Sequence, residues 1–246
     1  MIRIDRGPEP TGLSAMRQAQ LITVSAAKPE RTDSHRAAYC AFKDVLAERQ
    51  RKKCCYCERI ITASFNDVEH YRPFSQYWWL AWTWENLLFA CAPCNRSGKN
   101  DAFPLAAGSI TLQVGELPPG AERPLMLDPA TDDPRRHIRF LQVNGKWRPI
   151  GEDERGRETL RVLRFDDEYD DRVQRRVRVV MEWVGAVRDA IHTKSADSAR
   201  IADLWRRMTA CLLDDDQELR ALTEDVLRHE FESFPDPPDH ANNTIA

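Results

Sequence analysis

The fold is decided by four segments within one stretch of the chain, which read CCYC (54–57), DVEHYRP (67–73), WENL (84–87) and CAPCNRSGK (91–99). Each Cys-x-x-Cys pair forms a turn that points two thiolates at one ion, and two pairs make a closed tetrahedral site. The chain has seven cysteines, an odd number, and four of them in matched pairs indicate metal binding before disulfides. We expect a structural Zn²⁺ ion to be bound by Cys54, Cys57, Cys91 and Cys94.

The cysteine pattern leaves two alternatives open. The four paired cysteines could be buried or redox-active thiols without a metal. Cys55 lies inside the first pair and could be confused with Cys57 as a ligand; we assign Cys54 because it gives the standard two-residue gap. Cys40 and Cys211 fall on helical patterns, where we expect small buried side chains.

Composition narrows the class of protein. The 246 residues are 42% hydrophobic and 30% charged, which is typical of a soluble globular protein. The longest apolar runs, such as 78–82 and 87–91, are far shorter than a membrane span, and residues 1–16 lack the apolar core of a secretory signal. We therefore expect a cytoplasmic protein with no membrane partner. The net charge of −3 excludes binding of nucleic acid by bulk charge, so any polyanion site must be local.

Local patterns divide the chain into four expected parts. Residues 1–32 are rich in Pro and Gly and predict an irregular arm. A core at 33–106 starts with a helix over 33–51, and the Gly and Pro residues after Ala106 predict its boundary. A hairpin and helices follow at 107–233, and the polar, Pro-rich segment 234–246 predicts a disordered tail.

The C-terminal half contains clear signals for secondary structure. The Asn144-Gly145 pair within an alternating segment at 137–149 predicts a β-hairpin. Apolar residues at three- and four-residue spacing, for example Val173, Val177 and Val180, predict amphipathic helices. The predicted helices cover residues 153–164, 168–193, 197–212 and 216–232.

The segments between the cysteine pairs resemble the signature of HNH nucleases. They have an acid-His pair at Glu69-His70, a later Asn-Leu at Asn86-Leu87, and a closing C-x-x-C followed by Asn95 and a lysine. The nine-residue step from Asn86 to Asn95 also matches that family. The resemblance implies a ββα-metal core that hydrolyses phosphodiesters. The third signature position is often His, so this chain is an H-N-N variant, which bears on its metal preference.

Phosphodiester hydrolysis explains why these residue types are needed. The reaction requires an activated water and neutralisation of charge on the phosphate and the leaving oxygen. His70 titrates near neutral pH and suits a general base, while Glu69 and Asn95 offer oxygen ligands to Mg²⁺ or Mn²⁺. Asp67, two residues before Glu69 on the same strand face, could replace it as the acid ligand. By the resemblance, Asn86 fixes the loop that orients the base.

Several of these residues also have plain structural interpretations. Asn95 could cap the helix after the second cysteine pair. Arg72, Arg96 and Lys99 are candidate contacts to phosphate, but they could equally be solvated charges. The aromatic cluster around Tyr77 and Trp82 could stack on bases, although packing is the commoner role for such a cluster.

A wider resemblance extends over residues 35–180. Segments such as EHYRP at 69–73, FPL at 103–105, LDP at 127–129 and RGR at 155–157 are similar to the PtuB-type HNH proteins. Those proteins occur in Septu and retron anti-phage systems, whose partner is an ATPase of the ABC/SMC type. The resemblance implies that such an ATPase gates the nuclease. The acidic C-terminal helices would dock the ATPase or would simply cover the core.

We therefore predict an α+β protein. Its zinc-stabilised ββα-metal HNH core is flanked by an N-terminal helix and a mostly helical C-terminal part with one small β-hairpin. The first functional hypothesis is an endonuclease that cuts DNA, in preference to RNA, and leaves a 5′ phosphate and a 3′ hydroxyl. The rival hypothesis is a catalytically silent, zinc-stabilised adaptor for nucleic acid or protein.

Overall fold

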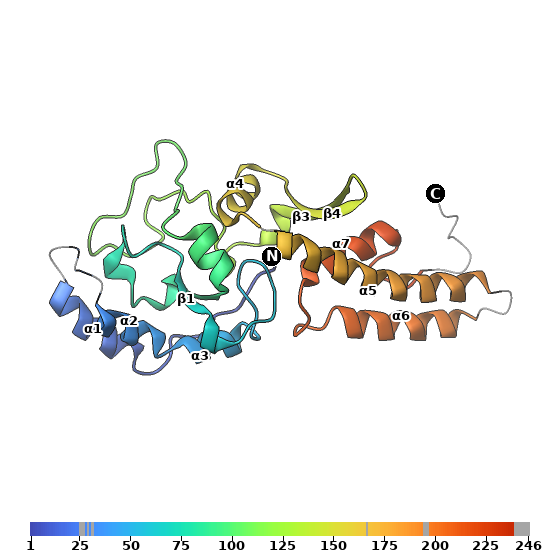
Figure 1. Ribbon diagram of the computed structural model, residues 1–246, viewed down its shortest axis with the longest axis horizontal. Helices are drawn as coiled ribbons and strands as arrows, with labels where there is room; N and C mark the ends of the chain where they lie inside the picture. The colour runs from blue at the N-terminus through green and yellow to red at the C-terminus, as the bar shows by residue number, and fades with distance from the viewer. Residues whose placement is uncertain (25–27, 29, 31, 166, 194–196, 239–246) are drawn as a thin grey trace. The chain divides into compact units, whose positions relative to one another are not determined.

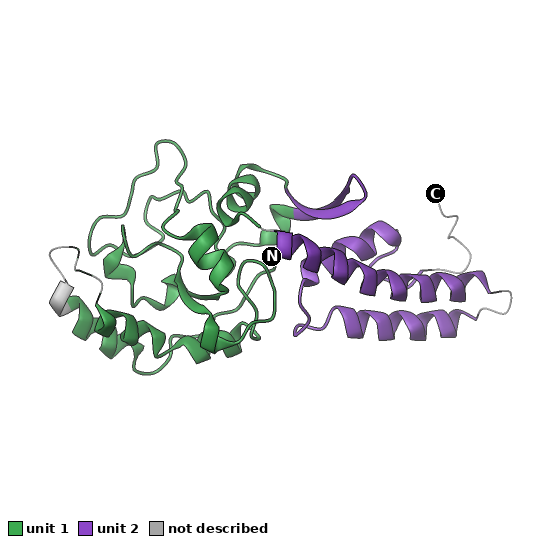
Figure 2. Ribbon diagram, in the orientation of Figure 1, with its two compact units in different colours: residues 1–138, 151–165 green, residues 139–150, 166–246 purple. Residues whose placement is uncertain are grey.

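The computed structural model divides the chain into two compact units (Figures 1 and 2). It describes residues 1–24, 28, 30, 32–165, 167–193 and 197–238. Unit 1 comprises Met1–Ile138 and Gly151–Phe165, and unit 2 comprises Arg139–Ile150 and Asp166–Ala246. The described residues form seven α-helices and two two-stranded antiparallel sheets, so the expected α+β class is confirmed.

Unit 1 is built around a short antiparallel pair of strands, β1 (Asp67–His70) and β2 (Leu87–Ala90). Asp67 pairs with Ala90 and His70 with Leu87. Every residue of β2 is buried, which anchors the pair in the core. The chain then enters a seven-residue π-helix, η4 (Pro93–Lys99). Two strands followed by a helix thus carry the whole segment 67–99. Single 3₁₀ turns complete this unit as η1 (Ala63–Phe65), η2 (Trp78–Leu80), η3 (Trp84–Asn86) and η5 (Pro134–Arg136).

The N-terminal region differs from the expectation in two ways. The arm contains a helix, α1 (Leu13–Val24), whose first residue Leu13 is fully buried; the segment after the prolines has few helix breakers. The single helix expected over 33–51 is two helices, α2 (Asp33–Cys40) and α3 (Lys43–Arg49), because the backbone leaves the helical conformation at Phe42. Thr32 is the N-cap of α2.

The Gly- and Pro-rich stretch after residue 106 is part of unit 1. The carboxylate of Glu122, which is fully buried, accepts hydrogen bonds from Arg72 Nε (2.8 Å), Tyr77 Oη (2.6 Å) and the Leu112 backbone N (3.0 Å). These contacts join residues 106–124 to the segment that follows β1. The first part of unit 1 therefore ends at Ile138, and not at the boundary near Ala106 that the sequence predicted. Tyr77, Trp79, Trp82 and Trp84 are buried here as packing residues.

The chain returns to unit 1 through α4 (Glu154–Leu163), which packs against η4. Gly98 on η4 lies so close to α4 that a Cβ atom at this position would stand 2.5 Å from the carbonyl oxygen of Leu163. Glycine is therefore required at this contact. Thr159 of α4 also accepts a hydrogen bond from the Leu127 backbone N at 2.9 Å.

Unit 2 contains the predicted hairpin and three helices. Its strands are β3 (Ile138–Val143) and β4 (Lys146–Gly151), and both turn residues, Asn144 and Gly145, have the positive φ that a tight hairpin requires. The helices are α5 (Asp167–His192), α6 (Ser198–Leu212) and α7 (Arg220–Glu230). Buried valines of α5 face α6 and α7. None of the described helices has the length and apolarity to cross a membrane.

Two smaller expectations are corrected in this structure. The start of the expected tail is packed, because Trp205 Nε1 donates to the Pro235 carbonyl at 3.0 Å and Phe234 lies against the Trp205 ring. The rest of that tail, 239–246, lies outside the described residues. Cys211 is exposed and Cys40 half-buried, so neither is a core residue.

Candidate metal centre and catalytic cleft

The first candidate site consists of four buried cysteine sulfurs. The Sγ atoms of Cys54, Cys57, Cys91 and Cys94 all lie within 4.8 Å of one another. The distance between Cys57 Sγ and Cys91 Sγ is 3.7 Å, far longer than a disulfide bond of about 2.05 Å. A tetrahedron with Zn–S bonds of about 2.3 Å has edges of about 3.8 Å. The cluster therefore has the size that a zinc ion needs.

Local backbone geometry selects Cys54 over Cys55 as the ligand. The Cys54 N–H donates to the Arg59 carbonyl at 2.9 Å, and the Glu58 N–H donates back to the Cys54 carbonyl at 3.1 Å. Glu58 has a φ of 60°, which closes this tight turn. The Cys55 N–H donates to the Phe89 carbonyl at 3.0 Å, and its sulfur lies outside the cluster. The four cysteines selected by the two-residue spacing are thus the four whose sulfurs lie together.

Charge also favours a cation in the cluster. Burial, together with the neighbouring Cys54, raises the pKa of the Cys57 thiol. The sulfurs of Cys54, Cys57 and Cys91 raise the pKa of Cys94. Crowded sulfurs cannot all ionise unless a positive charge sits among them. The donor set therefore fits a closed Zn²⁺ site of the structural kind.

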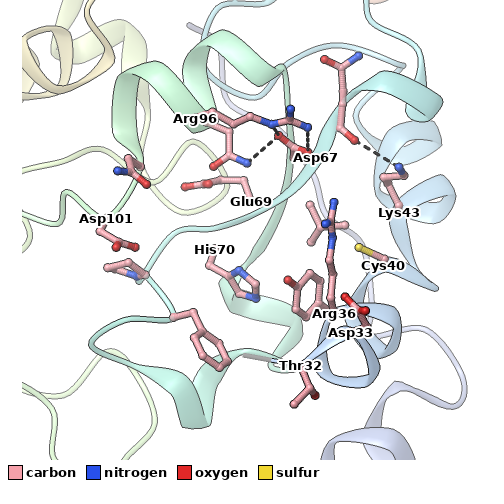
Figure 3. Close-up of a pocket in the computed structure, with 17 residues that line it drawn as sticks. Thr32, Asp33, Arg36, Cys40, Lys43, Asp67, Glu69, His70, Arg96 and Asp101 are labelled. Carbon is pink, nitrogen blue, oxygen red and sulfur yellow. Dashed lines mark hydrogen bonds and ion pairs between the residues drawn. The ribbon is translucent and has the colours of Figure 1, made fainter. Parts of the chain in front are cut away.

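His70 lies at the end of β1 in a second site, and its ring orientation is fixed. Its Nε2 lies 3.0 Å from the carbonyl oxygen of Ala81, which can only accept a hydrogen bond. Nε2 therefore carries the proton of the neutral ring, and Nδ1 has the lone pair. The ring of Tyr39, from α2, packs edge-on against the imidazole at 4.6 Å. Backbone and helix together hold His70 in one pose (Figure 3).

Asn86 is fully buried and binds the loop that follows His70. Its Oδ1 accepts from the Arg72 backbone N at 2.7 Å, and its Nδ2 donates to the carbonyls of Arg72 (3.0 Å) and Leu80 (3.2 Å). Leu80 directly precedes Ala81, whose carbonyl orients His70. The Asn86 side chain thus connects both ends of the loop over residues 72–81.

Glu69 and Lys99 form a buried ion pair beside His70. Lys99 Nζ lies 2.8 Å from Glu69 Oε1 and also donates to the His70 carbonyl at 2.8 Å. Tyr56 Oη donates to the same Glu69 oxygen at 3.1 Å. Burial raises the pKa of Glu69, and the charge of Lys99 opposes this increase. Among the described residues, Glu69 Oε2 has no hydrogen-bond partner, which leaves one oxygen for a ligand.

Asp67 is held by residues of η4. Arg96 binds both carboxylate oxygens at 2.8 Å, and Asn95 Nδ2 donates to Oδ2 at 3.0 Å (Figure 3). Burial raises the pKa of Asp67, but the hydrogen bonds from Arg96 and Asn95 bring it below its usual value. Because the amide nitrogen of Asn95 is committed to Asp67, its Oδ1 is the atom available to a cation.

These side chains line a cleft with a volume of about 490 Å³. Of the candidate residues, Glu69, His70, Asn95 and Arg96 line it, whereas Asn86 lies behind it. Arg72 and Lys99 do not reach the surface as the predicted phosphate contacts, because Arg72 pairs with Glu122 and Lys99 with Glu69 inside the protein.

Sequence reasoning missed one wall of this cleft. Arg36 and Cys40 from α2, with Lys43 from α3, line the side away from Arg96 (Figure 3), and Tyr39 of α2 also lines the cleft. The signal was present in the sequence, since residues 36, 39, 40 and 43 share one face at helical spacing. Nothing in the local pattern showed that this face would meet His70.

Comparison with known proteins identifies one relative for this chain. It is 32% identical over 162 residues to the Septu protein PtuB of Bacillus mycoides (strain KBAB4), which covers 57% of this chain and 55% of the relative. The chain thus spans about half the length of the curated relative it matches. No family model and no solved structure matches. Over these 162 residues the chain is PtuB-like, which confirms the resemblance predicted from its motifs.

Proposed function

We propose that this protein is a metal-dependent HNH endonuclease that hydrolyses phosphodiester bonds, with DNA preferred over RNA. The observation that carries the proposal is that Glu69 and His70 of β1 share one cleft with Asn95 of η4. The cluster of four cysteines lies in the same unit and can hold these elements together. This arrangement supports the ββα-metal core that the motifs predicted. An adaptor without catalytic activity would not need a histidine in a fixed orientation beside two oxygen atoms that are available to a metal ion.

His70 is the general base in this proposal. Because Nε2–H donates a hydrogen bond to the Ala81 carbonyl, Nδ1 is the atom that removes a proton from water. Asn86 supports this geometry indirectly, since it holds the loop that carries the Ala81 carbonyl. Tyr39 restricts the rotation of the ring. A preorganised base of this kind contributes about 10²- to 10⁴-fold to rate.

Glu69 Oε2 and Asn95 Oδ1 would hold the catalytic Mg²⁺ or Mn²⁺. Both are hard oxygen donors of the kind that these cations prefer. Such a cation supplies charge neutralisation at the phosphate and the leaving oxygen. Lys99 and Asp67 are positioning residues, because they hold Glu69 and Asn95 in place. Both Asp67 oxygens are engaged by Arg96, so the geometry favours Glu69 over Asp67 as the acid ligand.

The similarity to PtuB supports a cellular role in anti-phage defence. We place the chain as the cytoplasmic nuclease of a Septu-type anti-phage assembly, gated by an ABC/SMC-type ATPase. The support is the 32% identity over 162 residues to a Septu protein. The α5–α7 helices of unit 2 are the proposed docking element for the ATPase.

The nuclease proposal is tested with plasmid DNA and tRNA, incubated with Mg²⁺ or Mn²⁺ in the presence and absence of a Septu ATPase subunit. We expect His70→Ala to abolish cleavage and the exposed His192→Ala in unit 2 to leave it unchanged. Unchanged cleavage by His70→Ala would contradict the assignment of the base. Intact, zinc-loaded protein that cuts neither substrate with its partner would favour the adaptor hypothesis.

A further inference from the structure

We propose that Arg36 and Lys43 bind the phosphates that flank the scissile bond of the substrate strand. This inference rests on the proposed nuclease function and adds a phosphate-binding wall that lies outside the strand–strand–helix core. The wall is formed by α2 and the start of α3, and it faces η4 across the cleft floor of Glu69 and His70 (Figure 3).

The placement of the two cations suits an extended polyanion. Arg36 lies on α2, whereas Lys43 is the first residue of α3, so the two cations come from successive helices and line the cleft separately. They therefore flank the floor of the cleft rather than converge on one point. Contacts to phosphates on either side of the reacting bond would fix the register of the strand without reading its sequence.

The wall is held rigidly against the core. Tyr39 packs on the His70 ring, and Trp82 Nε1 donates to the His35 carbonyl at 3.3 Å. Both contacts come from α2, which also begins with a capping box between Thr32 and His35. A preorganised wall binds a charged ligand without the cost of ordering a loop.

Electrostatics distinguishes these two cations from the others around the cleft. Lys99 is neutralised by Glu69 and Arg96 by Asp67. Within the described part of the chain, neither Arg36 nor Lys43 has an ion-pair contact, and Lys43 Nζ donates to the Asn66 carbonyl at 3.3 Å. The charge of Arg36 acts on Asp67 only at longer range, where it helps to lower the pKa of that carboxyl group. They thus retain charge for an external anion.

Acidic groups in the cleft lining offset the charge of Arg36 and Lys43. Asp33 and Asp101 also line it, and the internal pairs carry no net charge. Without Arg36 and Lys43, the cleft would repel a phosphate backbone. With both cations present, the lining is close to neutral before any metal binds, so each contributes a large share of the attraction.

The test measures binding separately from cleavage. A His70→Ala chain is titrated against a fluorescein-labelled DNA oligonucleotide in Ca²⁺, by anisotropy over a series of salt concentrations. We expect Arg36→Gln and Lys43→Gln each to reduce the slope of log K against log salt by about 0.9 and to weaken binding several-fold. Arg36→Lys should retain the slope, and the exposed Arg178→Gln in unit 2 is the matched control.

The possible outcomes separate the two proposals. Unchanged slopes for both Gln variants, with zinc content and circular dichroism intact, would overturn the phosphate wall while leaving the nuclease assignment in place. Failure of the His70→Ala chain to bind the oligonucleotide at low salt would also overturn it. In the active protein, a higher KM with an unchanged kcat is the expected signature. Full cleavage by His70→Ala would instead count against the nuclease mechanism itself.

Discussion

The cysteine cluster and the candidate catalytic cleft both belong to unit 1, but their donor atoms are satisfied in different ways. In the cluster, four identical buried donors surround one position and leave no open ligand site. In the cleft, Lys99 binds one oxygen of Glu69, and Asn95 donates its amide nitrogen to Asp67, while Glu69 Oε2 and Asn95 Oδ1 stay available. The closed cysteine cluster is therefore suited to a structural role, whereas the available oxygens of the cleft are suited to binding a catalytic cation.

The largest effect is expected from breaking the closed cluster. Cys94→Ser should lose the zinc ion and unfold much of unit 1, because structural zinc binding contributes roughly 10 kcal/mol or more to folding in small zinc domains. Zinc content and circular dichroism measure this loss. The exposed Cys211→Ser is the matched control and should keep both. A folded Cys94→Ser chain without metal would show that the cluster is not a zinc site.

The next effect comes from breaking the buried pair that supports the cleft. Lys99→Met leaves Glu69 buried without its cation and should destabilise the protein by about 3–5 kcal/mol. Urea unfolding measures the change. Adding Glu69→Gln to this variant should restore part of the stability but not the cleavage. Equal stability of the single and double variants would contradict the coupling between the two side chains.

A change of metal preference would show whether Asn95 contacts the catalytic cation. Asn95→His replaces an amide oxygen by an imidazole nitrogen, which favours Ni²⁺ or Zn²⁺ relative to Mg²⁺. We expect the ratio of cleavage rates in Mg²⁺ and Ni²⁺ to fall by about tenfold or more. The test is a comparison of initial rates in each metal, with wild-type protein alongside. An unchanged ratio would mean that Asn95 does not touch the cation.

The smallest effect concerns a surface contact outside both regions. Asp153 caps α4 through the Gly156 N–H and binds His137 Nδ1 at 2.6 Å. Burial raises the pKa of Asp153, but these contacts bring it below its usual value. Its stabilisation is therefore present at neutral pH and disappears as the pH falls through the lowered pKa. Asp153→Ala should cost about 1 kcal/mol at pH 7 and almost nothing in strong acid, as measured by denaturation at each pH.

Short-range patterns predicted much of this molecule correctly. The spacing of Cys54 and Cys57 sets the first metal-binding turn, and Asn144-Gly145 sets the hairpin, because both depend on only a few adjacent residues. The helices α4 to α7 follow from apolar periodicity. Of the side chains in the motif around His70, Glu69, His70 and Asn95 line one cleft, whereas Asn86 lies behind it.

Long-range pairing could not be predicted in the same way. Arg72 and Lys99 looked like surface contacts to phosphate, but their partners are Glu122, fifty residues later, and Glu69, thirty residues earlier. No local pattern specifies such a pair. The same limit applies to α2, whose face toward His70 depends on how two distant segments pack.

The close contact between Gly98 and Leu163 has a consequence for synthesis of the chain. The helix that carries Asn95 and Lys99 rests on α4, which is made only after the whole β3–β4 hairpin has been translated. A nascent or truncated chain that stops before residue 163 lacks this support, although it already contains every cysteine ligand and every candidate catalytic residue. Completion of the candidate catalytic cleft is thereby delayed until most of the polypeptide exists.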